Sequence, residues 1–90
     1  MELKEMIAMG TARMGDQKRL AAEIWVRADE LTHAKSGRRG LPAHACTRLA
    51  EIIGIDPSAV LIASSLVTEK NPERRAYLSP FVNIGGKAAA

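Results

Sequence analysis

The sequence predicts an all-α domain, a compact bundle of five to six short helices. Three observations lead to this fold class. Apolar residues recur at three- and four-residue spacings, glycine and proline signals break the chain into short pieces, and no stretch shows sustained apolar–polar alternation. The 90 residues, 47% of them apolar and 26% charged, suit one small folded domain. A short strand over residues 81–84 stays open.

The chain begins with two predicted helices. The first carries apolar side chains at helical spacing from Leu3 to Ile7 and is expected to stop within residues 10–15. The second is expected over residues 17–24, where Asp16 precedes it as an N-cap whose side-chain oxygen accepts a free amide proton. The residues of the second helix that are expected to face inward are Leu20, Ala21 and Ile24.

Two further helices flank a basic loop. The third is expected over residues 28–36, and Gly37 suits a left-handed cap at its end. The loop over residues 38–41 contains two arginines, and Pro42 then suits the first turn of a fourth helix over residues 43–53. The residues expected to face inward are Leu31 and Ala34 in the third helix and Ala45, Leu49, Ile52 and Ile53 in the fourth.

Paired cap and proline signals start the last two helices. Gly54 ends the fourth helix, and Asp56-Pro57 then supplies a capping carboxylate and a proline with a preset φ, so a fifth helix is expected over residues 57–70. Asn71-Pro72 repeats this signal for a short sixth helix, which Ser79-Pro80 should close.

These elements form one expected domain over residues 1–84, with a core over residues 3–57 and C-terminal helices over residues 57–81. Residues 85–90, Gly-Gly-Lys-Ala-Ala-Ala, are expected to form a flexible tail. The alanine run in this tail is of the kind that expression cloning leaves behind.

Composition excludes several classes of protein. The length excludes an enzyme with a cofactor domain of its own, and we expect neither enzymatic activity nor a cofactor. The single Cys46 excludes a disulfide scaffold and suits a reducing cytoplasm. The chain opens without the basic and apolar stretches of a secretory signal, and its longest apolar stretch, residues 59–67, is far shorter than the ~20 residues of a membrane span. We therefore expect a cytoplasmic protein without a membrane partner.

Neither a metal site nor a small-molecule ligand is indicated. The conventional soft ligands are His33, His44 and Cys46, fewer than the set of four at paired spacings that zinc prefers. His44 and Cys46 also lie on different faces of the predicted fourth helix. Cys46 is expected to be a small core residue rather than a nucleophile.

The positive charge gathers in one segment of the chain. In total, 13 Lys and Arg against 10 Asp and Glu give a formal net charge of +3. Residues 13–48 hold eight basic and four acidic side chains, a net of +4, and the remainder has a net of −1. A domain that faces a polyanion is built in this way, although an ordinary solvated surface gives the same count.

One segment of this basic region carries a recognisable pattern. Residues 17–39, QKRLAAEIWVRADELTHAKSGRR, resemble the helix-turn-helix of Cro/CI-type phage repressors, and residues 49–57 resemble the family's next helix and its exit. The resemblance implies a lambda-repressor-like core and a transcriptional regulator of phage or prophage origin. Such a protein binds double-stranded DNA, acting as a homodimer on a palindromic operator. The matching positions are Gln17, Leu20, Ala21, Val26, Leu31, Gly37, Arg38 and Arg39.

The spacing also gives a physical basis for DNA reading. Two short helices cross steeply only if a small residue lies at their contact, and Ala21 supplies it. Leu31 and Ala34 turn inward, which leaves the opposite face of the third helix, with Thr32 and His33, free for a groove. By the resemblance, the base-reading residues are Ala28, Asp29 and His33, with Arg27 and Thr32 beside them. The expected phosphate contacts are Gln17 and Lys18 at a helix N-terminus and Lys35, Arg38 and Arg39 at and beyond the end of the third helix.

Two features depart from the family's pattern. Trp25 stands where the family usually has glycine, because that turn needs a left-handed backbone. Asp29 and Glu30 place two carboxylates where phosphates are near. They either accept a hydrogen bond from cytosine or cap the third helix and pair with Arg27 or His33. These residues motivate an alternative function, a protein-interaction module (an antitoxin-like or inhibitory partner) that keeps the core without specific DNA binding.

The fifth helix needs cover on more than one side, because its apolar residues wrap nearly all round it. The cover is either the sixth helix, through Tyr77, Leu78 and Phe81, or a second subunit. The residues expected at a dimer interface are Leu66, Tyr77 and Phe81.

Overall fold

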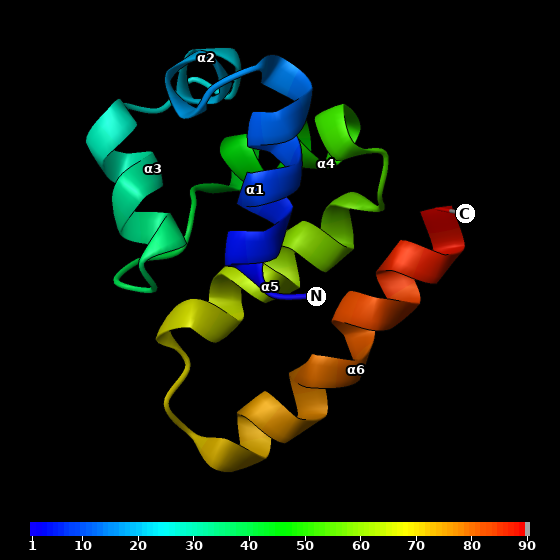
Figure 1. The fold of residues 1–90 in the computed structure, drawn as a ribbon. Coiled ribbons are helices and arrows are strands. Elements are labelled where there is room, and N and C mark those ends of the chain that lie inside the picture. Colours follow the sequence, from blue (N-terminus) through cyan, green and yellow to red (C-terminus); the bar gives the residue numbers. More distant parts are fainter. Residues whose placement is uncertain (90) are drawn as a thin grey trace.

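Six helices follow one another along the part of the chain that the structure describes, which is the backbone of residues 1–89 and the side chains of residues 1–82 (Figure 1). No strand occurs within these limits of this computed structural model, so the predicted all-α bundle is confirmed. The helices are α1 (Leu3–Met14), α2 (Gln17–Glu23), α3 (Ala28–Lys35), α4 (Ala43–Ile53), α5 (Pro57–Thr68) and α6 (Pro72–Ala89).

The three helix starts that carry a polar cap signal begin where the sequence predicts them. Asp16 Oδ1 accepts from the backbone N–H of Arg19 at 2.7 Å, and Asp56 Oδ1 accepts from the backbone N–H of Ser58 at 2.8 Å. Asn71 Oδ1 accepts from two amides in the first turn of α6, at 2.9 and 3.1 Å. Each side chain satisfies amide protons that have no partner within the helix. The helix ends are less well predicted, since α5 stops two residues before the expected limit.

The core lies where α1, α4 and α5 meet (Figure 1). A Cβ atom on Gly10 would lie 2.7 Å from Leu49 Cδ1, so α1 and α4 approach closely because this position carries no side chain. The residues predicted to face inward are buried, except Ile52, which is half-buried against the core. The largest fully buried side chains are Leu3, Met6, Ile7, Leu20, Ile24, Leu31, Cys46, Leu49 and Val60.

Helix α6 differs most from its prediction. The end expected at Ser79-Pro80 is wrong, and so is the strand considered for residues 81–84, because α6 continues through Pro80. A proline inside a helix removes one backbone hydrogen bond, but Val82, beyond it, is buried against the core and favours continuation of the helix. The side chains of residues 83–90 lie outside the described residues, so the flexible tail expected over residues 85–90 stays a prediction.

Helix α6 covers α5, but not through all the side chains expected to do so. Val82 is buried and Leu78 is half-buried, whereas Tyr77 is 70% exposed and Phe81 is 39% exposed. At 100° per residue, Tyr77 and Phe81 share the side of α6 that faces away from Val82. Their ring centroids are 5.5 Å apart, so the two aromatic side chains form one exposed pair.

Candidate nucleic-acid interface

Helices α2 and α3 meet in the arrangement that a helix-turn-helix requires. In Figure 1, α2 is seen end-on while α3 runs down the picture at the edge of the molecule, so the two axes cross steeply. Ala21 is 3% exposed, and Leu31 and Ala34 of α3 are buried. The backbone N–H of Val26 donates to Ala21 O at 3.0 Å, which closes the turn between the helices. The burial of a small residue in α2 fits the requirement that steeply crossed helices place for one at their contact.

The turn passes through a strained residue. Trp25 has φ = 56°, and no other non-glycine residue with described backbone has a positive φ. This left-handed conformation costs a non-glycine residue about 1–2 kcal/mol. His44 Nε2 donates to Trp25 O at 3.1 Å, while the indole is 69% exposed and lies 6.4 Å from the imidazole between ring centroids. The chain therefore keeps the backbone conformation expected at this position without the glycine that would adopt it most easily.

The residues predicted to read bases lie on the outer side of α3 with one exception. Ala28 and Thr32 are exposed, as are Arg27 and Asp29, but His33 is half-buried. The expectation that His33 lies on the exposed face of the third helix together with Thr32 is therefore wrong, since the His33 side chain is half-buried. Thr32 Oγ1 donates to Ala28 O at 3.0 Å, a bond that fixes its hydroxyl on the helix.

The two carboxylates at the start of α3 both engage Arg27. Glu30 Oε1 accepts from the backbone N–H of Arg27 at 3.2 Å and lies 3.5 Å from Nε of the same residue. Asp29 Oδ1 accepts from Arg27 Nε at 3.2 Å. Of the two interpretations that the sequence leaves open, this arrangement matches capping and pairing. Arg27 would have to leave both carboxylates before its guanidinium could contact a base.

The residues predicted to contact phosphates divide into two groups. Gln17 is half-buried and joins the helices, because its Nε2 donates to Thr32 Oγ1 at 3.2 Å and its Oε1 accepts from Lys35 Nζ at 3.5 Å. Lys18, Lys35, Arg38 and Arg39 are exposed. Lys35 thus bridges to the first turn of α2, and the other three cations extend into solvent.

The loop that carries Arg38 and Arg39 is fixed by a contact that sequence reasoning missed. Ser64 of α5 is buried, and its Oγ accepts from Leu41 N at 2.7 Å and donates to Leu41 O at 3.1 Å. A Cβ atom on Gly40 would lie 2.5 Å from Ser64 Oγ, so only glycine fits here. A serine in an apolar helix is the signal that could have identified this anchor.

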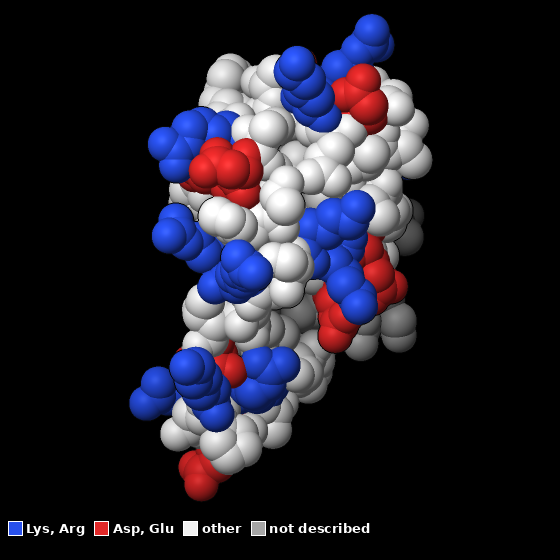
Figure 2. All heavy atoms as spheres, turned by 60° about the vertical axis from the view of Figure 1, so that its left-hand side comes forward, with Lys and Arg blue, Asp and Glu red and all other residues white. Residues whose placement is uncertain are grey.

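Charge on this side of the molecule is distributed rather than continuous. Figure 2 shows lysine and arginine side chains in several groups, separated by uncharged surface and in places beside acidic side chains. Two arginines of the basic segment also have structural partners. Arg48 pairs with Glu23 of α2 and with Glu51, and Arg13 Nη1 donates to Ile52 O at 3.3 Å. The hydrogen bond from Arg48 to Glu23 raises the pKa of the guanidinium.

The remaining candidates lie elsewhere. Cys46 is fully buried, and its burial raises the pKa of the thiol, so the prediction of a small core residue is confirmed. Within the described part of the chain, no three His, Cys, Asp or Glu side chains gather as metal ligands would, and no helix is long and apolar enough to cross a bilayer. Leu66 lies against the core between α5 and α6, away from the exposed pair Tyr77 and Phe81. These three residues therefore do not form one surface.

Comparison with known proteins gives no match to a protein-family model, a curated protein or a solved structure.

Proposed function

We propose that this chain binds double-stranded DNA in a sequence-specific manner through α2 and α3 and acts as a transcriptional regulator of the Cro/CI type. The observation that carries the proposal is the pairing of two short, steeply crossed helices of which the second presents an exposed outer face. An exposed helix at the edge of a small domain has the dimensions that the major groove of DNA admits.

In the proposed complex the two classes of contact have separate roles. Thr32 and Ala28 face the base edges, where a methyl group can pack on thymine. The Thr32 hydroxyl donates to Ala28 O and accepts from Gln17, so it has one acceptor position left for a base donor. Phosphate contacts fix the register of the protein without reading sequence. The cations proposed for these contacts are Lys18, Lys35, Arg38 and Arg39. The anchored loop supports this role, because Leu41 is bonded to Ser64 on both its N–H and its C=O.

A homodimer is part of the proposal, because two reading helices on a palindrome bind half-sites about 34 Å apart. The exposed pair Tyr77 and Phe81 on α6 is the surface we propose for this contact. Leu66 of α5 is not included in this dimer surface, since it lines the cavity between α5 and the inner side of α6. A phage or prophage origin, which the resemblance implies, and a cytoplasmic location, which the single Cys46 suits, are also part of the proposal.

The proposal is tested by selecting duplexes from a random library and measuring affinity by fluorescence anisotropy at several salt concentrations. The Arg38→Ala, Arg39→Ala double variant should weaken binding to all sequences alike, and the log–log salt slope should fall by about two, one for each lost phosphate contact. Lys70→Ala, which removes an exposed lysine between α5 and α6, is the matched control and should leave the slope unchanged. An unchanged slope in the double variant would contradict the phosphate assignment.

The base-reading residues need a different comparison. Thr32→Ala should keep the fold but cost about 1–3 kcal/mol of discrimination at one base pair in each half-site. Leu31→Ala, one position away and fully buried, should instead lose about 2–5 kcal/mol of folding stability, with DNA binding falling only as the fold fails. If Thr32→Ala leaves operator selectivity intact, α3 is not the reading helix.

A second candidate function is the protein-interaction module, and two observations favour it. The indole of Trp25 is 69% exposed. Arg27 forms ion pairs with Asp29 and Glu30 at the N-terminal end of α3, which is the end that should enter the groove. A protein interface built on the indole would depend weakly on salt, whereas DNA binding weakens steeply as salt rises. The salt series therefore separates the two functions.

A further inference from the structure

A cavity on another side of the molecule joins the N-terminus of α1, the C-terminal end of α3, and the inner faces of α5 and α6. Its volume is about 490 Å³, within the range of roughly 300–1,000 Å³ that small-molecule sites occupy. The apolar residues that line it are Met1, Leu3, Ala34, Ala63, Leu66, Val67 and Val82. Four of these residues are buried, Leu66 and Val67 are half-buried and Met1 is exposed, so most of the apolar lining belongs to the packed part of the molecule.

The charged side chains around this apolar lining are mostly basic. Lys4, Lys35 and Arg75 line the cavity, and Glu2 is the acidic residue among the described residues that line it. Glu2 lies 3.8 Å from Lys4 and so offsets that cation in part. Lys35 has an amide, Gln17 Oε1, as its partner at 3.5 Å, which leaves its charge uncompensated. The site therefore favours an anion.

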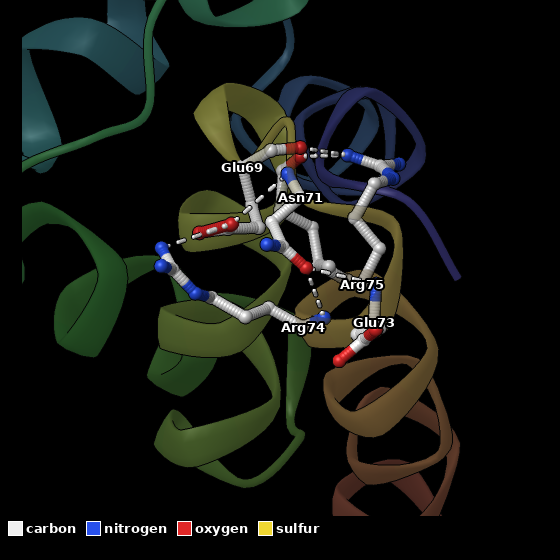
Figure 3. A network of polar contacts seen from close by, with 6 residues as sticks. Glu69, Asn71, Glu73, Arg74 and Arg75 are labelled. Atoms are coloured by element: carbon white, nitrogen blue, oxygen red, sulfur yellow. Dashed lines mark hydrogen bonds and ion pairs between the residues drawn. The ribbon is translucent and has the colours of Figure 1, made fainter.

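Arg75 is the cation that the fold holds in place. Its Nη1 donates to Leu66 O at 2.6 Å and to Glu69 O at 2.8 Å, the free carbonyls at the end of α5 (Figure 3). In the same view Arg74 points to the other side, where it meets the Glu69 carboxylate at 3.5 Å. Among the described residues no acceptor bonds Nε or Nη2 of Arg75, and no carboxylate lies within ion-pair distance of it. A guanidinium with two adjacent free donors matches the two oxygens of a carboxylate.

We propose that this cavity binds a small carboxylic acid with an apolar body, its carboxylate on Arg75 and its hydrocarbon part against Leu66, Val67 and Val82. Lys35 belongs both to this cavity and to the phosphate contacts proposed above. A bound carboxylate close to Lys35 should therefore weaken DNA binding. This last consequence rests on the proposed function, whereas binding of the acid does not.

The binding step is tested on the full chain by titrating octanoate and following backbone amide shifts by NMR. Shifts should concentrate within residues 2–4, 34–37, 63–67 and 75–82, the ranges that contain the residues lining the cavity. Octanol lacks the charge and octylammonium reverses it, so both should bind more weakly. Equal affinity for octanol, or no site-specific shifts at millimolar octanoate, would overturn the proposal.

Substitutions separate the charge on Arg75 from its structural bonds. Arg75→Gln should raise the Kd for octanoate about tenfold, which is the effect expected from losing one charged hydrogen bond. Arg74→Gln, on the same turn of α6, should leave this Kd unchanged. Because Arg75→Gln also removes two bonds at the end of α5, a second variant is needed. Glu2→Gln removes the acidic neighbour and should tighten binding about two- to fivefold. Equal Kd values for Arg75→Gln and Arg74→Gln, or weaker binding in Glu2→Gln, would overturn the assignment.

The DNA measurement is made separately, with and without octanoate. If octanoate binds but no duplex is selected, the acid site stands and the proposed function fails. If a duplex is selected but octanoate does not bind, the proposed function stands and the acid site is wrong. If both bind and octanoate leaves the DNA affinity unchanged, the shared use of Lys35 is wrong.

Discussion

At the scale of single residues, Trp25 adopts the left-handed backbone expected at this turn although tryptophan is unfavourable in it. The position was predicted to need a left-handed backbone, and φ is 56° there although the side chain is tryptophan. The rule held because the turn is fixed on both sides, by the Val26 bond to Ala21 and by the His44 bond to Trp25 O. What the sequence did not predict is that His44 supplies the second of these bonds from α4.

Replacing this residue should separate backbone strain from side-chain contact. Trp25→Gly removes a conformational cost of about 1–2 kcal/mol but adds roughly 0.5–1 kcal/mol of unfolded-state entropy, so it should stabilise the protein by about 0.5–1 kcal/mol. Trp25→Ala keeps the strain and should give no such gain. Urea unfolding followed by circular dichroism measures both, because each variant lacks the only tryptophan. A glycine variant less stable than the alanine variant would mean that strain at this turn is negligible.

At the scale of helices, the starts were easier to predict than the ends. A start such as that of α5 depends on one side chain and its nearest amides, which are local in sequence. The end of α6 depends on Val82 packing against a core assembled from distant residues, and a local proline signal does not contain that information. The anchor between Ser64 and Leu41 was missed for the same reason, since 23 residues separate its two partners.

The cap of α5 should make stability depend on pH. Hydrogen bonds from the Ser58 hydroxyl and the Ser58 backbone N–H lower the pKa of Asp56 below its ordinary value. A carboxyl whose pKa is lower in the folded state contributes stability that is present above its unfolded pKa of about 3.9 and is lost as pH falls through its folded pKa.

The matching experiment compares thermal unfolding of the wild type and Asp56→Ala across this range. The alanine variant should have the lower Tm at neutral pH, and the difference should narrow as the pH falls below about 4, where the carboxylate takes up its proton. Ser58→Ala removes only the hydroxyl donor. Its Tm at neutral pH should also be lower than that of the wild type, but by less than for Asp56→Ala. A difference in Tm that stays constant down to acidic pH would show that the charge on Asp56 plays no part in the cap.

At the scale of the whole molecule, the number of cations in a segment predicts a ligand-binding surface less well than the positions of these cations in the fold. The surplus of cations over residues 13–48 includes Arg48 and Arg13, which hold α4 against its neighbours, and Arg27, which is paired with Asp29 and Glu30. The loop arginines, Arg38 and Arg39, keep the exposed position predicted for them. Which cations pair within the fold depends on tertiary distances, so the sequence could indicate a basic region but not the part of it available to a ligand.

The exposed pair on α6 and the packed Leu66 of α5 should have different roles in assembly. If the exposed pair on α6 joins two copies, Phe81→Asp should give a folded monomer, because a carboxylate in an apolar contact has no partner and its burial is unfavourable. Leu66→Asp should act differently, since Leu66 packs against the core and a charge there should lower the free energy of unfolding before it affects association. Sedimentation velocity at micromolar concentration, with circular dichroism on the same samples, measures both properties.

For the wild type, the expected species is a dimer that binds a palindrome with half-sites about 34 Å apart, while the Phe81→Asp monomer should bind one half-site weakly. Tyr77→Asp, one turn before Phe81 on the same face, should behave like Phe81→Asp because the centroids of the two rings are 5.5 Å apart. A wild-type protein that stays monomeric in free solution and on DNA would exclude α6 as a dimer contact. In that case the Tyr77 and Phe81 pair would be a surface without a role in DNA binding, and a single reading helix would have to supply all of the specificity.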